Sequence, residues 1–226
     1  MRDRTSSVAR AGRSPAAASL DLVCCSAEHR RLVVAVDVAA RGPASIPWQA
    51  LDPSVGLDAA AARLARERLG RAPAWIAALG AFGDQRKHPS QAALSVGYVA
   101  VVPMGTAAPV GMVWADVTDL PALPARQAAM VTAAVSALRD RMDLVPIAFR
   151  LLPSEFTLSE LQEMYELLLG RRLHKASFRR ALQGAYLVEP TDSWRSEGRG
   201  RPAQLFRYAP RRRRGHRRSV RFELLT

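Results

Sequence analysis

The sequence has few cysteines, few lysines and no long apolar run. Its two cysteines, Cys24 and Cys25, are adjacent, and adjacent cysteines rarely form a good disulfide. With no second pair and no zinc-type spacing, we expect a reduced, cytoplasmic protein. No segment approaches the ~20 consecutive apolar residues of a membrane span, and the N-terminus lacks the apolar stretch and cleavage site of an export signal. The 226 residues suffice for one large or two small soluble domains.

Acidic residues are scarce at the C-terminal end. From Arg171 onward there are 16 Lys and Arg against 4 Asp and Glu, whereas the rest of the chain has 17 against 16. This segregation indicates a polyanion partner that docks on one face. An arginine-rich composition from a GC-rich genome would explain why only Lys87 and Lys175 are lysines, but it would not confine the excess charge to one end.

The hydrophobic pattern predicts an α/β (α+β) protein of two domains with a tail at each end. Residues 1–18, rich in Arg, Ser and Ala, are predicted to be a disordered tail. Residues 19–145 are predicted to form a mixed sheet with flanking helices. Asp58 is the expected N-cap of the first helix, which Gly70 ends, and 41–53 is expected to be a loop. The expected strands are 19–25, 31–38, 75–82, 94–102 and 110–117, and the expected helices are 58–69 and 123–142.

Residues 146–210 have the order of a winged helix-turn-helix: a connector (146–153), two helices and a hairpin. Thr157 and Glu160 have the spacing of a capping box at the start of the first helix. Its apolar stripe is Leu158, Leu161, Tyr165 and Leu168; Glu160, Glu163 and Glu166 are expected to face water, and Gly170 ends it. The second helix, from Lys175 to about Gln183, should turn Phe178, Leu182 and Ala185 inward. Strands at 186–189 and 204–208 would pair as the wing.

The second helix is the candidate for the DNA major groove. Lys175, Ser177, Arg179 and Arg180 supply long donors on its outer side, and arginine pairs bidentately with guanine. The alternative is that this helix is an ordinary solvated surface helix with no role in DNA binding.

The hairpin tip suits the minor groove. Its Arg199-Gly200-Arg201-Pro202 is also the core of AT-hook peptides, because arginines fit the narrow, negative minor groove of A·T-rich DNA. The alternative is a solvent-exposed turn. Residues 211–226 form a basic tail that would either add salt-dependent phosphate affinity or remain solvated.

Three segments of the first domain resemble the later strands of a Nudix domain: 79–84, 95–102, and Trp114 with 119–121. The helix before them then lies where the Nudix box belongs, whose clustered glutamates hold divalent metals that activate water. With Gly70 as the last glycine of the box, Arg63 and Glu67 keep their register, but Leu64 and Arg68 replace metal-binding glutamates. One carboxylate beside an arginine cannot assemble a metal cluster. We therefore expect no catalytic residue, no metal and no cofactor, and a protein that is not an enzyme.

The C-terminal region resembles the NrtR family, Nudix-related transcriptional regulators of NAD metabolism in which a degenerate Nudix domain precedes a winged helix. The matching segments are 152–153, 156–162, 165–166, 169–171, 175, 178–180, 187–191 and 200–206. The resemblance implies a homodimeric repressor that binds a palindromic double-stranded DNA operator near NAD-biosynthesis or salvage genes.

The same resemblance implies that ADP-ribose, or a related nucleotide, binds the Nudix-like domain and releases DNA. It adds Gln204 to the DNA contacts, beside Arg199 and Arg201 of the hairpin tip. The implied effector contacts are Trp48, Asp84 and Lys87; Lys87-His88-Pro89 stands where the family commonly has Arg-Asp-Pro.

Two alternatives remain open at this stage. The chain could be a Nudix hydrolase of a nucleoside diphosphate derivative with an unusual box. It could also be a non-specific nucleic-acid-binding protein that relies on its arginine tail.

Overall fold

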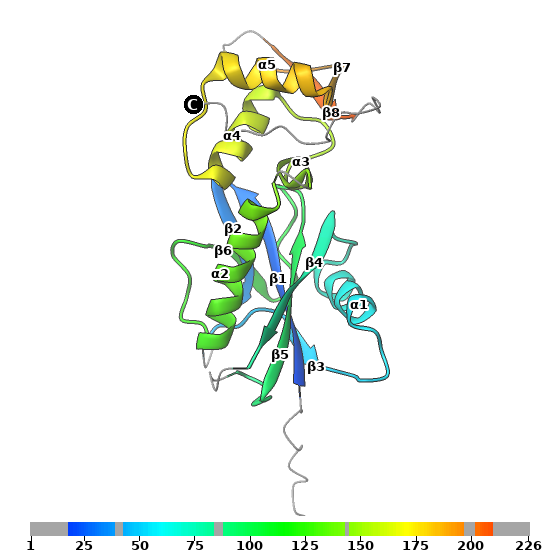
Figure 1. Ribbon diagram of the computed structural model, residues 1–226, viewed down its shortest axis with the longest axis vertical. Helices are drawn as coiled ribbons and strands as arrows, with labels where there is room; N and C mark the ends of the chain where they lie inside the picture. Colours follow the sequence, from blue (N-terminus) through cyan, green and yellow to red (C-terminus); the bar gives the residue numbers. More distant parts are fainter. Residues whose placement is uncertain (1–17, 39–42, 84–87, 143–144, 197–201, 210–226) are drawn as a thin grey trace, which may run out of the picture.

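The computed structural model describes residues 18–38, 43–83, 88–142, 145–196 and 202–209. Over these residues the fold is mixed α/β, as predicted: a six-stranded sheet with helices on its faces precedes a winged helix (Figure 1). Except for Ala18, which begins β1, and Pro202, the predicted tails and hairpin tip lie outside the described residues. The elements are β1 (Ala18–Glu28), β2 (Arg31–Asp37), β3 (Trp48–Ala50), α1 (Leu57–Leu69), β4 (Trp75–Phe82), β5 (Leu94–Val101), β6 (Met112–Asp116), α2 (Ala125–Asp140), α3 (Ile147–Leu151), α4 (Leu158–Leu169), α5 (Lys175–Ala185), β7 (Val188–Arg195) and β8 (Ala203–Tyr208).

The sheet is built around β1, the first strand of the chain. The strand order is β4-β5-β1-β2-β6, and β3 also pairs with β1. The β1–β5 pair is parallel, with Leu22 opposite Tyr98, whereas the other pairs are antiparallel. All of β1 between its two end residues is buried. A strand covered on both faces needs such a near-continuous apolar run.

Alternate residues of β1 supply two different cores, because successive side chains point to opposite faces of a sheet. Leu20, Leu22 and Cys24 pack in the core beneath α1. Val23 and Cys25 belong to the core on the other face, which continues past α2 into the winged helix. Figure 1 shows α1 and α2 on opposite sides of the sheet.

The expected capping of α1 is wrong. The helix begins at Leu57, one residue before the predicted start, and its N-cap is Gly56, with no side-chain cap. Asp58 instead accepts a hydrogen bond from the Tyr98 hydroxyl at 2.7 Å. Burial and this carboxylate together raise the pKa of Tyr98 to about 12. Gly70 ends the helix in the left-handed region (φ 65°), as predicted.

Two short elements were not predicted. The segment expected to be a loop at 41–53 contains β3, and the connector at 146–153 contains α3. In the winged helix, both halves of the predicted capping box are present: Thr157 Oγ1 accepts from the Glu160 N–H at 3.1 Å, and Glu160 accepts from the Thr157 N–H at 2.7 Å. The wing strand β7 is longer than predicted and pairs antiparallel with β8.

Polar contacts and one shared core join the sheet to the winged helix. The Met104 N–H donates to the Leu151 carbonyl at 2.7 Å. Arg30, in the turn between β1 and β2, reaches Glu163 of α4 at 2.8 Å. In the described part of the chain, no helix has the length and apolar character needed to cross a membrane.

Candidate functional site

The candidate DNA-binding helix α5 is anchored by its apolar side. Phe178 and Leu182 are buried, as predicted, and the Phe178 ring meets Tyr165 of α4 edge-on, with centroids 5.6 Å apart. Ala185 is half-buried. Because these anchors fix the rotation of α5, they also fix which of its residues face outward.

The outward face of α5 carries free positive charge. Lys175, Arg179 and Arg180 are exposed, and within the described ranges none of the three has a hydrogen-bond or ion-pair partner. Ser177 is half-buried, with its hydroxyl 3.3 Å from His174 Nδ1. Figure 1 places α5 at the end of the molecule remote from β3. The three cations can therefore meet phosphates or base edges without first breaking an interaction within the described chain.

The wing adds one predicted residue and one that was missed. Gln204 on β8 is half-buried, with Nε2 3.5 Å from the Thr191 carbonyl. Its cross-strand partner is Trp194, whose exposed fraction is 57%. A large exposed aromatic on the wing is a candidate nucleic-acid contact. Arg199 and Arg201 lie outside the described residues.

The prediction that Glu166 faces water is wrong. Only 9% of its side chain is exposed, and it accepts from the Leu173 N–H at 2.9 Å, from Gln162 and from Arg172. Burial opposes ionisation of Glu166, but these hydrogen bonds and the Arg172 charge outweigh it and lower its pKa. Glu166 thereby holds the turn that leads from α4 into α5.

The residues of α1 do not fit a Nudix metal centre. Leu64 is buried, and Glu67 pairs with Arg63 at 3.8 Å on the exposed side. Throughout the described residues, no group of three His, Cys, Asp or Glu lies close enough to hold a metal ion.

Of the predicted effector contacts, Asp84 and Lys87 lie outside the described residues. Trp48 is half-buried on β3, and its indole meets the His88 imidazole edge-on, with centroids 5.4 Å apart. His88 does not face solvent: its side chain is fully buried. His88 therefore packs against Trp48 from inside the domain.

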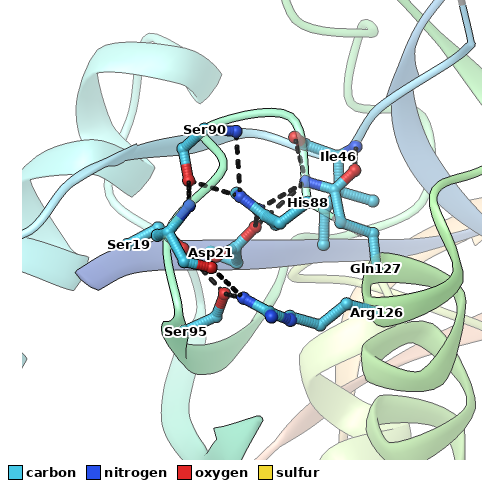
Figure 2. A network of polar contacts seen from close by, with 9 residues as sticks. Ser19, Asp21, Ile46, His88, Ser90, Ser95, Arg126 and Gln127 are labelled. Atoms are coloured by element: carbon cyan, nitrogen blue, oxygen red, sulfur yellow. Dashed lines mark hydrogen bonds and ion pairs between the residues drawn. The ribbon is translucent and has the colours of Figure 1, made fainter. Parts of the chain in front are cut away.

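His88 belongs to a buried polar network on the α2 side of the sheet (Figure 2). Asp21 of β1 accepts from His88 Nε2 at 2.6 Å, from Gln127 of α2 at 3.0 Å and from Ser19 at 2.8 Å. The Ser90 N–H points at His88 Nδ1 at 3.1 Å. This geometry makes Nδ1 an acceptor and leaves the proton on Nε2, where it bonds Asp21.

The network continues to a buried arginine. Arg126 of α2 is 3% exposed and donates to the Ala92 carbonyl at 2.7 Å and to Ser95 Oγ at 3.1 Å. Ser95 lies 2.8 Å from Ser19, which reaches Asp21. A chain of hydrogen-bonded groups thus connects the Arg126 cation to the Asp21 carboxylate through the hydroxyls of Ser95 and Ser19. The two buried charges are opposite in sign and offset each other.

Comparison with known proteins agrees with this arrangement. Residues 148–208 match the family model described as the NrtR DNA-binding winged helix domain. The C-terminal domain belongs to the NrtR winged-helix family. The ADPR responsive transcriptional repressor NtrR of Acinetobacter baylyi is 45% identical over 71 residues, which are 31% of this chain and 27% of that relative. The match therefore spans only about a quarter of the relative's length.

Solved structures extend the likeness to both domains at the level of the fold. The NrtR of Shewanella oneidensis, complexed with a 27mer DNA, matches with a TM-score of 0.72 and 24% identity, over 85% of this chain and 93% of that one. A MutT/nudix family protein of Enterococcus faecalis matches with a TM-score of 0.62 and 14% identity, over 88% of each chain. The fold is thus a Nudix-like domain followed by a winged helix.

Proposed function

We propose that the chain is a DNA-binding transcriptional repressor that places α5 in the major groove. The observation that carries this proposal is the outer face of α5, a helix anchored by Phe178 and Leu182. Its Lys175, Arg179 and Arg180 are exposed and have no partner among the residues that the structure describes. Arginines so placed can reach base edges, while neighbouring cations neutralise phosphates. Ser177, Gln204 and the wing arginines Arg199 and Arg201 complete the proposed DNA surface.

The repressor would act as a two-fold homodimer on a palindromic operator. Two copies of α5 about 34 Å apart would then enter successive major grooves on one side of the duplex. The regulated genes would be those of NAD biosynthesis or salvage, in the cytoplasm. These points extend the family likeness of the C-terminal domain to the whole chain.

The Nudix-like domain would sense ADP-ribose or a related nucleotide. Support comes from the Acinetobacter baylyi relative, whose name describes it as ADPR responsive, and from Trp48, which His88 holds on β3. Asp84 and Lys87 would complete the effector site. A ligand can release DNA only if it binds the DNA-free arrangement more tightly than the DNA-bound one.

The residues of α1 in the Nudix-like domain disfavour a hydrolytic function. Glu67 pairs with Arg63, and Leu64 is buried where a metal-binding glutamate would stand. We expect no turnover of ADP-ribose in the presence of Mg²⁺ or Mn²⁺. Turnover that disappears in Glu67→Gln would replace the repressor proposal with a hydrolase.

The test is a gel shift with the full chain on its own promoter and on promoters of NAD genes, with and without ADP-ribose. We expect a specific shift that ADP-ribose weakens. Arg66→Ala is the control variant: it removes one exposed charge from α1, away from the DNA surface, and should bind DNA like the wild type. Equal binding of scrambled and promoter duplexes would refute the specific-repressor proposal.

Truncation after Pro210 separates the proposal from a tail-driven binder. A specific repressor would lose salt-dependent background binding, through counterion release, and keep its preferred palindrome. A protein that binds through its tail would lose nearly all affinity.

A further inference from the structure

A basic cleft lies where the sheet domain meets the winged helix, and the proposed function does not use it. Its volume is about 660 Å³, within the ~300–1,000 Å³ range of small-molecule sites. Its walls come from both domains: the start of β4, the turn after β5, α3 with the segment that follows it, and the end of β8. We call this the interdomain cleft.

No acidic side chain of the described residues lines the interdomain cleft, whereas three arginines do. Arg71 and Arg150 are exposed, and neither has a hydrogen-bond or ion-pair partner among residues the structure describes. Arg207 is already paired with Glu189. By contrast, the cavity beside Arg30 contains both Glu163 and Glu166. The cleft therefore presents two uncompensated cations, one from each domain.

The cleft also has an aromatic wall. The rings of Phe149 and Tyr208 pack with centroids 4.5 Å apart and planes 38° apart. The buried Phe156 also lines the cleft. Tyr208 is half-buried and lines the cleft. Ser154 is exposed at the rim and adds a hydroxyl donor.

We propose that the interdomain cleft binds a small phosphorylated ligand that carries a planar group, at a site separate from Trp48 and α1. Arg71 and Arg150 would hold the phosphate, since guanidinium forks match phosphate oxygens. The planar group would pack on Tyr208. A recessed cleft suits a small ligand better than a DNA backbone, and α5 lies at the far end of the winged helix (Figure 1).

The ligand would favour one placement of the two domains, because its phosphate partners belong to different domains. A ligand that needs both Arg71 and Arg150 binds only where both line the cleft, so it shifts the protein toward that arrangement. This inference does not depend on the identity of the effector at the Nudix-like face.

Calorimetric titration of the full chain tests the proposal with three probes: AMP, adenosine and inorganic pyrophosphate. We expect AMP to bind more tightly than adenosine, which lacks the phosphate, and than pyrophosphate, which lacks the ring. Arg71→Ala/Arg150→Ala should weaken AMP binding by about tenfold or more, the equivalent of ~1.4 kcal/mol. Arg66→Ala should leave it unchanged. Ser154→Glu, which keeps both arginines and adds a carboxylate at the rim, should weaken AMP binding similarly.

Three results would overturn the proposal. The first is AMP binding that is the same in the wild type and the cleft variants, which would put the nucleotide elsewhere. The second is no measurable binding of AMP. The third is a loss of DNA affinity in the cleft variants when no nucleotide is present, since the cleft would then belong to the DNA surface. A failure of DNA repression with the AMP results intact would refute the proposed function but not this site.

Discussion

Asp21→Asn tests whether the buried network holds the sheet domain together. Asp21 is fully buried and accepts hydrogen bonds from Ser19, His88 and Gln127. An asparagine keeps the shape, but it removes the negative charge and turns one acceptor into a donor. Only one of the two terminal atoms can then accept a hydrogen bond, and Arg126 loses the charge that offsets it.

The magnitude follows from these contacts. Each hydrogen bond to a charged group contributes ~1.5–3 kcal/mol, and removing one partner of a buried ion pair costs ~3–5 kcal/mol. Because two hydroxyls separate Arg126 from Asp21, we expect the lower end of this range, about 3 kcal/mol. At ~2–4 °C per kcal/mol for a domain of this size, the Tm should fall by roughly 6–12 °C.

Urea and thermal unfolding followed by circular dichroism measure this loss. Asp119→Asn is the matched control: it makes the same change at an exposed position and should stay within about 0.5 kcal/mol. A double variant with Arg126→Leu should lose less stability than the two single variants added together, because it removes both charges. A loss below about 1 kcal/mol in Asp21→Asn, within the ordinary range of single substitutions, would show that Arg126 does not depend on Asp21.

Three further outcomes follow from the structure. Phe178→Ala should lower the free energy of unfolding by ~3–5 kcal/mol and abolish DNA binding. Arg179→Ala should leave the Tm unchanged but cost ~1–3 kcal/mol of DNA-binding free energy and relax the base preference. An equal loss of affinity for all DNA sequences would mean that Arg179 contacts only phosphate. Burial raises the pKa of Cys24 to about 12 and that of Cys25 further, so neither thiol should react with a disulfide reagent at pH 8 until the protein unfolds; rapid labelling of the native state would contradict the buried β1. Because the pKa of Glu166 is lowered in the folded state, its stabilising effect is full above the unfolded-state pKa and disappears as the pH falls through the folded-state pKa. The loss of unfolding free energy in Glu166→Gln should therefore shrink in acid. A loss that stays constant with pH would contradict an ionised Glu166.

Features that depend on residues close in sequence were predictable. Thr157 and Glu160 are three residues apart, so their reciprocal hydrogen bonds follow from local geometry alone. Gly70 and Gly170 end their helices at φ 65° and 66°, where other residues are strained. The amphipathic pattern of α5 likewise predicted that Phe178 and Leu182 would be buried.

Features that depend on distant residues were not predictable. Asp58 was expected to cap α1, but its carboxylate instead accepts a hydrogen bond from the hydroxyl of Tyr98, 40 residues away. Glu166 lies on the nominally polar side of α4, yet the turn at Leu173 folds back over it. In the polar network, Asp21 meets Gln127 across 106 residues. None of these contacts leaves a periodic or local signal in the sequence.

One of the two α1 positions that lack a metal-binding glutamate, Leu64, is packed in the core. In the register of the Nudix resemblance, Leu64 stands where a metal-binding glutamate belongs. It is 2% exposed and packs in the same core as Leu20 and Leu22 of β1. A glutamate at this position would bury a carboxylate among apolar side chains, which costs several kcal/mol unless it is neutralised or paired. The core that keeps the Nudix-like fold thus disfavours a metal ligand at Leu64, and this supports the proposal that the domain does not hydrolyse a nucleotide.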